Sequence, residues 1–180
     1  MLQTHRGAQV LIVDDYADTA LLLQRLLARH GLEHLHVATD PRTVLDHLPE
    51  LNPDLVLLDL YMPYVDGYTM LRHIRDWAGQ QYLPVVVLTA DVRPETLLRA
   101  INDGATDFLT KPFNATEILI RVRNLLHTRA LHLAVNDLTA EDLVVNASIA
   151  RAGRAVSRSR RPPITAGETE MGIATVRHVG

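Results

Sequence analysis

Three carboxylates, a hydroxyl and an ammonium each follow a short apolar segment in the first part of the chain. The carboxylates are Asp14, Asp15 and Asp59, the hydroxyl belongs to Thr89, and the ammonium belongs to Lys111. Clustered carboxylates need a cation, and oxygen ligands without cysteine favour Mg²⁺, which often shares its ligands with a phosphate. Asp59 has the chemistry of a nucleophile toward a phosphoryl group. Thr89 and Lys111 would then stabilise the transferring oxygens.

Lys111 is the one lysine among 18 basic residues, and all the others are arginine. Lysine carries a compact point charge on a flexible stem, which suits a small polar site better than the rigid fork of arginine. An excess of arginine can also reflect genome composition. The place of Lys111 in the chain is therefore more informative than its rarity.

The elements that must position these groups alternate between strand and helix through residue 127. Continuous runs of branched apolar residues predict strands that are buried on both faces of a parallel sheet. The strands are expected at residues 10–13, 34–38, 56–58, 85–88 and 107–109. Helices are expected at residues 19–28, 40–48, 67–77, 93–104 and from the capping box at 114–117 onward. This order predicts an α/β fold with a five-stranded parallel sheet flanked by helices.

In such sheets, ligands collect outside the carboxyl ends of the strands. The three carboxylates, the Thr89 hydroxyl and the Lys111 ammonium all follow strands at these ends. The sequence therefore predicts that one rim of the sheet gathers all five groups. An acidic pair after a strand is by itself more often a helix cap, so the prediction depends on the combination.

Four segments, in this order, closely resemble the receiver domain of bacterial two-component response regulators. They are the acidic pair in residues 11–15, the acceptor segment 57–67, the hydroxyl segment 88–90 and the lysine motif 104–113 with a cis bond before Pro112. The resemblance covers residues 8–127. It implies a flavodoxin-like fold with strand order 2-1-3-4-5 and a function in phosphorelay signal transduction.

The resemblance also implies a role for each site residue. Asp59 would be the phospho-acceptor, and Mg²⁺ would be held by Asp14, Asp15, Asp59 and the Tyr61 backbone carbonyl. Thr89 and Lys111 would contact the phosphoryl group, and Thr89 would form the switch together with Phe108. Tyr61 and Asp91 would tune the lifetime of the acyl phosphate. A buried core phenylalanine is the alternative for Phe108, and a surface tyrosine is the alternative for Tyr61.

The partners implied by the resemblance are a sensor histidine kinase or phosphotransfer protein, and a downstream target of unknown identity. The leucines of residues 21–27 are numerous enough to supply both a core face and a partner-facing margin, and Arg25 marks the exposed side. The chain would catalyse only its own phosphorylation and dephosphorylation, so we do not expect a turnover enzyme. A receiver used only for constitutive docking is disfavoured, since docking alone would not require a lysine at 111.

Composition excludes several other classes of protein. The chain has 180 residues, 47% hydrophobic residues and no cysteine, which argues against wholesale disorder, a disulfide scaffold and thiolate metal sites. The first residues lack the apolar segment of a secretory signal, and no apolar run approaches the ~20 residues of a membrane helix. We therefore expect a cytoplasmic protein with no membrane partner. His34 and His36 are expected to be surface residues.

The C-terminal part differs from the rest in charge. Residues 1–127 hold 11 Lys/Arg and 16 Asp/Glu, whereas residues 128–180 hold 7 and 5. We expect a helical extension at 128–150, with a second helix cap at 139–142 and possible pairing into a homodimer, and then a basic, disordered tail at 151–180. The arginines of 151–161 suggest the alternative of a nucleic-acid-binding regulator. An inert tail, or the product of a truncated or shifted reading frame, is favoured because no aromatic residues or helix-turn-helix pattern accompany them.

Overall fold

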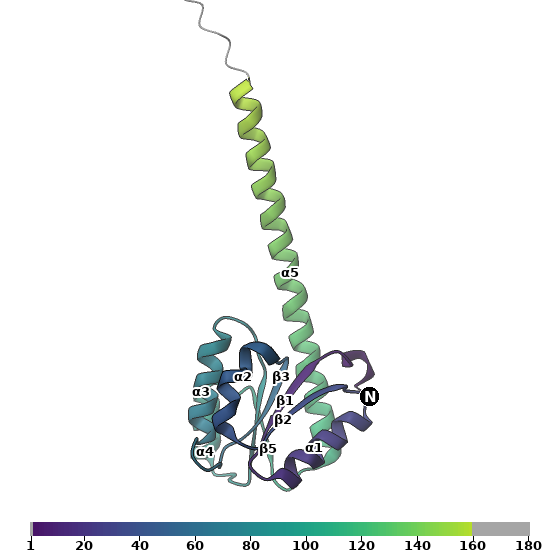
Figure 1. Cartoon of the computed structure of the whole chain (residues 1–180), viewed down its shortest axis with the longest axis vertical. Coiled ribbons are helices and arrows are strands. Elements are labelled where there is room, and N and C mark those ends of the chain that lie inside the picture. Colours follow the sequence, from purple (N-terminus) through teal and green to yellow (C-terminus); the bar gives the residue numbers. More distant parts are fainter. Residues whose placement is uncertain (1, 160–180) are drawn as a thin grey trace, which may run out of the picture. The chain divides into compact units, whose positions relative to one another are not determined.

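Five parallel strands form one sheet in the order β2-β1-β3-β4-β5. Helices lie on both sides of this sheet (Figure 1). The structure is a computed structural model that describes residues 2–159, and the side chains of residues 2–138. The strands are β1 (Gln9–Val13), β2 (His34–Ala38), β3 (Leu55–Asp59), β4 (Val85–Thr89) and β5 (Asp107–Thr110). The predicted fold class, strand order and strand positions are confirmed.

The helices cover both faces of the sheet because alternate strand residues point to opposite sides. The helices are α1 (Ala17–Arg29), α2 (Val44–Leu51), α3 (Gly67–Ala78), α4 (Pro94–Asn102) and α5 (Ala115–Ser159), with 3-10 turns η1 (Gln3–His5) and η2 (Pro41–Thr43). One apolar core lies between the sheet and helices α2, α3 and α4, and Val56 and Leu58 contribute to it from β3. The other lies between the sheet and helices α1 and α5, and Leu55 and Leu57 contribute to it.

The helix starts that matter for the rim are fixed by side-chain caps. The Asp66 carboxylate accepts a hydrogen bond from the Thr69 N–H at 2.7 Å and so caps the start of α3, the helix that follows β3. The Asn114 side chain accepts from the N–H groups of Thr116 and Glu117 at the start of α5. The Glu117 side chain pairs with Arg121. Of the predicted capping box, the structure therefore shows the hydrogen bonds to the Asn114 side chain, and Glu117 pairs within the helix instead.

One predicted helix begins differently in the structure. Asp40 caps the short 3-10 turn η2, and the α-helix α2 begins only at Val44. Pro41 fits the first turn of either kind of helix because it needs no N–H partner there. The prediction of one helix from residues 40–41 to 48 is corrected to a 3-10 turn followed by α2, which ends at Leu51.

Helix α5 is continuous from Ala115 to Ser159. The predicted second cap at residues 139–142 is wrong, because the helix passes through these residues without a break. The helix also includes residues 151–159, which were expected to be disordered; the rest of the predicted basic tail, residues 160–180, lies outside the described part of the chain. The chain divides into two compact units, residues 1–137 and 138–180.

Within the first unit, a buried arginine attaches α5 to the opposite end of the sheet from the carboxylate rim. The Arg129 side chain is only 5% exposed and donates to the Tyr82 carbonyl at 2.8 Å. Its Nε lies 3.4 Å from Asp54, whose other carboxylate oxygen accepts from the Gln9 N–H at the start of β1. These contacts hold the part of α5 around Arg129 against the N-terminal end of β1.

Candidate functional site

The carboxyl ends of four strands deliver the predicted reactive groups to one rim. Asp14 and Asp15 directly follow β1, while Asp59 and Thr89 are the last residues of β3 and β4. Lys111 follows β5, and its backbone N–H donates to the Thr89 carbonyl at 2.8 Å. The peptide bond between Lys111 and Pro112 is cis, as the family resemblance implies. The sheet therefore brings together the groups that the sequence places at its strand ends.

The Lys111 ammonium joins two buried carboxylates. Its Nζ donates to Asp14 Oδ2 and to Asp59 Oδ2, each at 2.8 Å. The side chain of Asp14 is fully buried and that of Asp59 is 7% exposed. Buried carboxylates are costly unless they are paired with a cation. Lys111 provides that charge for both strand ends.

Burial and pairing shift the pKa values of these groups in identifiable ways. Burial raises the pKa of Asp14, and the hydrogen bond and charge of Lys111 only partly oppose this. Burial alone would lower the pKa of Lys111, but its hydrogen bonds to Asp14 and Asp59 outweigh burial and raise it. Lys111 is therefore firmly protonated at neutral pH.

The three carboxylates are arranged as a cation site. One oxygen from each of Asp14, Asp15 and Asp59 lies within 4.8 Å of the others. Asp15 Oδ1 is buried and has no hydrogen-bond partner among the described residues. An unpartnered buried carboxylate oxygen that faces two further carboxylates fits a hard divalent cation such as Mg²⁺. The residues present therefore fit the ion that the sequence predicts.

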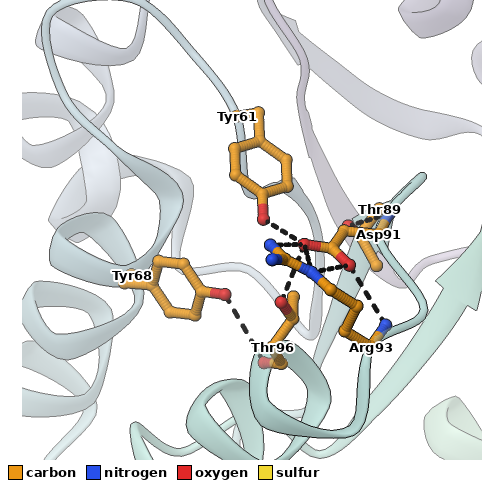
Figure 2. Close-up of polar contacts among 6 residues, drawn as sticks. All are labelled: Tyr61, Tyr68, Thr89, Asp91, Arg93 and Thr96. Carbon is orange, nitrogen blue, oxygen red and sulfur yellow. Dashed lines mark hydrogen bonds and ion pairs between the residues drawn. The ribbon is translucent and has the colours of Figure 1, made fainter.

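Tyr61 contacts both Asp59 and the loop that follows β4. Its backbone N–H donates to Asp59 Oδ1 at 3.3 Å, which places the Tyr61 peptide beside the carboxylate. The residue is 53% exposed, and its phenol hydroxyl donates to Asp91 Oδ2 at 2.9 Å (Figure 2). Tyr61 is thus a surface residue whose hydroxyl has the Asp91 carboxylate as its hydrogen-bond partner.

The two predicted switch residues lie on adjacent strands. Thr89 is fully buried, and its Oγ1 accepts a hydrogen bond from the Asp91 N–H at 3.0 Å. Phe108 is half-buried and packs against the core between the sheet and helices α2, α3 and α4. In this state Thr89 is held by its own loop, and Phe108 contributes to the core while keeping part of its ring exposed.

Gly67 lies directly against the end of β3. A Cβ added at this position would lie 2.5 Å from the Leu60 Cα and closer still to the Asp59 carbonyl oxygen. The Gly67 N–H donates to the Leu60 carbonyl at 2.9 Å, so the first turn of α3 supports the end of β3. Only glycine permits this approach of two backbones.

A doubly wound parallel sheet with three carboxylates and a paired lysine at its carboxyl edge defines a phospho-acceptor signalling module. The sequence matches the response regulator receiver domain over residues 10–123. The chain therefore belongs to the response regulator receiver domain family of two-component signalling. Receiver domains in general take their phosphoryl group from histidine kinases.

Known proteins resemble this part of the chain. The sensory/regulatory protein RpfC of Xanthomonas campestris is 39% identical over 129 residues, which are 70% of this chain and 18% of RpfC. The regulatory protein AtoC of Escherichia coli is 36% identical over 125 residues, which are 69% of this chain and 25% of AtoC. The structure of the chemotaxis protein CheY4 of Vibrio cholerae is 27% identical, with a TM-score of 0.61, and matches 66% of this chain and 98% of its own. The chain thus spans about a quarter or less of the length of the first two relatives.

The structure adds residues that the sequence did not single out. Arg93 and Thr96 both contact the Asp91 carboxylate. Nothing in the spacing of Thr96 indicates its contact with Asp91, because it depends on how α4 begins. Among residues 2–159, no helix is both long and apolar enough to cross a membrane.

Proposed function

We propose that this chain accepts a phosphoryl group on Asp59 from a phosphohistidine of a sensor kinase or phosphotransfer protein. The observation that carries this proposal is the Lys111 ammonium, which lies 2.8 Å from both Asp14 and Asp59 beside the unpartnered oxygen of Asp15. A structural ion pair would need neither the third carboxylate nor its unsatisfied oxygen. Phosphorylation then changes the binding of a downstream target.

The chemistry follows from the position of each group. A carboxylate oxygen of Asp59 attacks phosphorus, the bond from phosphorus to the donor nitrogen breaks, and imidazole leaves. Mg²⁺ held by Asp14, Asp15, Asp59 and the Tyr61 carbonyl would supply positive charge to the phosphoryl oxygens. Lys111 keeps a second positive charge beside Asp59. The Thr89 hydroxyl donates to a phosphoryl oxygen once it has given up its hydrogen bond from the Asp91 N–H.

The remaining roles follow from contacts near the acceptor. The Thr89 movement opens space toward which the half-buried Phe108 ring turns, so that these two residues form the switch. Tyr61 and Asp91 restrict the approach of water to the acyl phosphate, because the phenol hydroxyl and the carboxylate are joined at 2.9 Å beside Asp59. Hydrolysis kinetics of the phosphorylated Tyr61→Ala variant test this role, and an unchanged lifetime would count against it.

The decisive experiment is labelling with a small phosphodonor such as acetyl phosphate. We expect the native chain to gain one phosphoryl group in the presence of Mg²⁺ and essentially none with EDTA. Asp59→Asn should abolish labelling, because the amide is no nucleophile toward phosphorus, and mass spectrometry of the intact chain measures both results. Equal, stable labelling of the native chain and of Asp59→Asn would contradict the proposal.

Helix α1 is the proposed docking surface for the kinase. Its Ala20, Leu23 and Leu27 are buried, whereas Leu22 is 61% exposed beside the charged Arg25. We expect Leu22→Arg to slow phosphotransfer from a histidine kinase that phosphorylates the native chain by about tenfold, the effect of ~1.4 kcal/mol. Labelling by acetyl phosphate should not change, and Leu131→Arg on the exposed side of α5 is the matched control. Loss of both kinds of labelling would indicate damage to the fold instead of a docking surface.

A further inference from the structure

The Asp91 carboxylate is a meeting point for three segments of the chain. Its Oδ2 accepts from the Tyr61 hydroxyl at 2.9 Å and from the Thr96 hydroxyl at 2.8 Å (Figure 2). Its Oδ1 accepts from the backbone N–H and the Nε of Arg93, at 3.0 and 2.9 Å. One carboxylate thus joins the loop after β3, the loop after β4 and the first turn of α4.

The same residue holds the buried hydroxyl beside the acceptor. The Asp91 backbone N–H donates to Thr89 Oγ1 at 3.0 Å, and Thr89 is fully buried. If the Thr89 side chain turns toward a phosphoryl group on Asp59, this N–H loses its partner unless the loop follows. A loop movement of this kind pulls the Asp91 carboxylate away from Tyr61 and Thr96.

The contacts of Asp91 differ in what they constrain. The Arg93 side chain is 73% exposed and only two residues away, so its ion pair with Asp91 acts mainly within the loop itself and contributes little as a surface pair. Thr96 is 7% exposed and belongs to α4, and Tyr61 belongs to the acceptor loop. The hydrogen bonds from the Thr96 and Tyr61 hydroxyls to Asp91 are therefore the contacts that join the loop to α4 and to the loop after β3.

We infer that Asp91 is a positioning residue that latches residues 90–93 to α4 and to Tyr61, and so keeps Thr89 turned away from Asp59 until phosphorylation. This inference rests on the proposed function of Asp59 as acceptor. The latch adds to the free energy that separates the two states of the loop, so a weaker latch raises the population of the switched state. Helix α4 moves with the loop because Thr96 is in its first turn.

The test uses the unphosphorylated full chain and measures amide hydrogen exchange by NMR. We expect the Asp91 amide proton to exchange about tenfold faster in Thr96→Val, which removes the hydroxyl while keeping the shape of the side chain. Tyr61→Phe should have a similar effect. Thr96→Ser keeps the hydroxyl and should exchange at close to the native rate.

Tyr64→Phe is the matched control for the tyrosine variant. Tyr64 is 80% exposed in the same loop, and its hydroxyl makes no hydrogen bond within the part of the chain that the structure describes. Its removal should leave the exchange rate of the Asp91 amide unchanged. Native exchange rates in both Thr96→Val and Tyr61→Phe would overturn the latch.

A second measurement separates this inference from the proposed function. Beryllium fluoride with Mg²⁺ mimics a phosphoryl group on a carboxylate, and we expect it to bind Thr96→Val about tenfold more tightly than the native chain. If the native chain is neither labelled at Asp59 nor bound by the mimic, the proposed function fails. The exchange rate of the Asp91 amide in Thr96→Val and Tyr61→Phe still tests the latch in that case. If the native chain is labelled at Asp59 and binds the mimic, but Thr96→Val binds the mimic with the same affinity as the native chain, the latch is overturned and the proposed function stands.

Discussion

Replacement of Lys111 by methionine is expected to lower the free energy of unfolding by about 3 kcal/mol at pH 7 without Mg²⁺. The substitution keeps most of the side-chain volume but removes the positive charge that lies 2.8 Å from both Asp14 and Asp59. Two buried carboxylates then remain beside Asp15 with no cation. Urea denaturation measures the difference, and addition of Mg²⁺ should restore a large part of the lost stability.

The loss should depend on pH with a definite sign. The raised pKa of Lys111 means that its stabilisation is complete at neutral pH and is lost only as the pH rises through that value. The pKa of Asp14 is already raised by burial, and removal of Lys111 raises it further. Protonation of this carboxyl relieves the uncompensated charge, so the difference between Lys111→Met and the native chain should shrink as the pH falls from neutral toward acid.

Two further variants separate the charge of Lys111 from its geometry. Lys111→Arg keeps a positive charge and should leave the fold intact, but the planar guanidinium cannot occupy the same small site, so the response to phosphorylation should weaken. Arg72→Met removes a cation from the partly exposed pair with Asp103 and should change stability by less than about 0.5 kcal/mol. Equal stability of Lys111→Met and the native chain with EDTA would contradict the predicted role of the ammonium.

Replacement of Gly67 by alanine is the second change with a large expected effect. The added methyl group would meet backbone atoms of Asp59 and Leu60, which cannot move aside as a flexible side chain can. We expect the free energy of unfolding to fall by about 3 kcal/mol through this overpacking. Because β3 must shift to accept the methyl group, labelling of Asp59 should also slow by roughly tenfold or more.

Gly7→Ala is the matched control for this variant. A Cβ at Gly7 has no atom within 4 Å and the backbone there has no positive φ, so stability and labelling should stay at native values. Denaturation measures the first effect, and the initial rate of labelling by acetyl phosphate measures the second. Native stability of Gly67→Ala would show that the end of β3 yields more easily than its packing indicates.

The sheet could be predicted because its strands are short apolar runs at regular intervals. Val85 to Leu88 have buried neighbours on both faces, so their sequence carries a strong signal of burial. The helix boundaries were less predictable: Pro41 fits both kinds of first turn, and the cap-like residues at 139–142 lie inside α5 because no glycine or proline interrupts the helix there.

The rim could be predicted because strand order alone brings the strand ends together. Contacts between loops could not, since they depend on side-chain directions that no spacing records. Asp91 was singled out through the family resemblance, but its hydrogen bonds to Thr96 and Tyr61 appear only when α4 and the loop after β3 are placed. The close approach of Gly67 to Asp59 likewise depends on the angle at which α3 leaves the sheet.

The single lysine has a practical consequence for spectroscopy. A chain grown with isotopically labelled lysine carries the label at one residue, Lys111, whose Nζ contacts Asp14 and Asp59. Its side-chain NMR signals therefore need no assignment by mutagenesis, and every change in them originates at the carboxylate rim. The protein contains its own reporter for metal titration and phosphorylation, without an attached dye or an engineered residue.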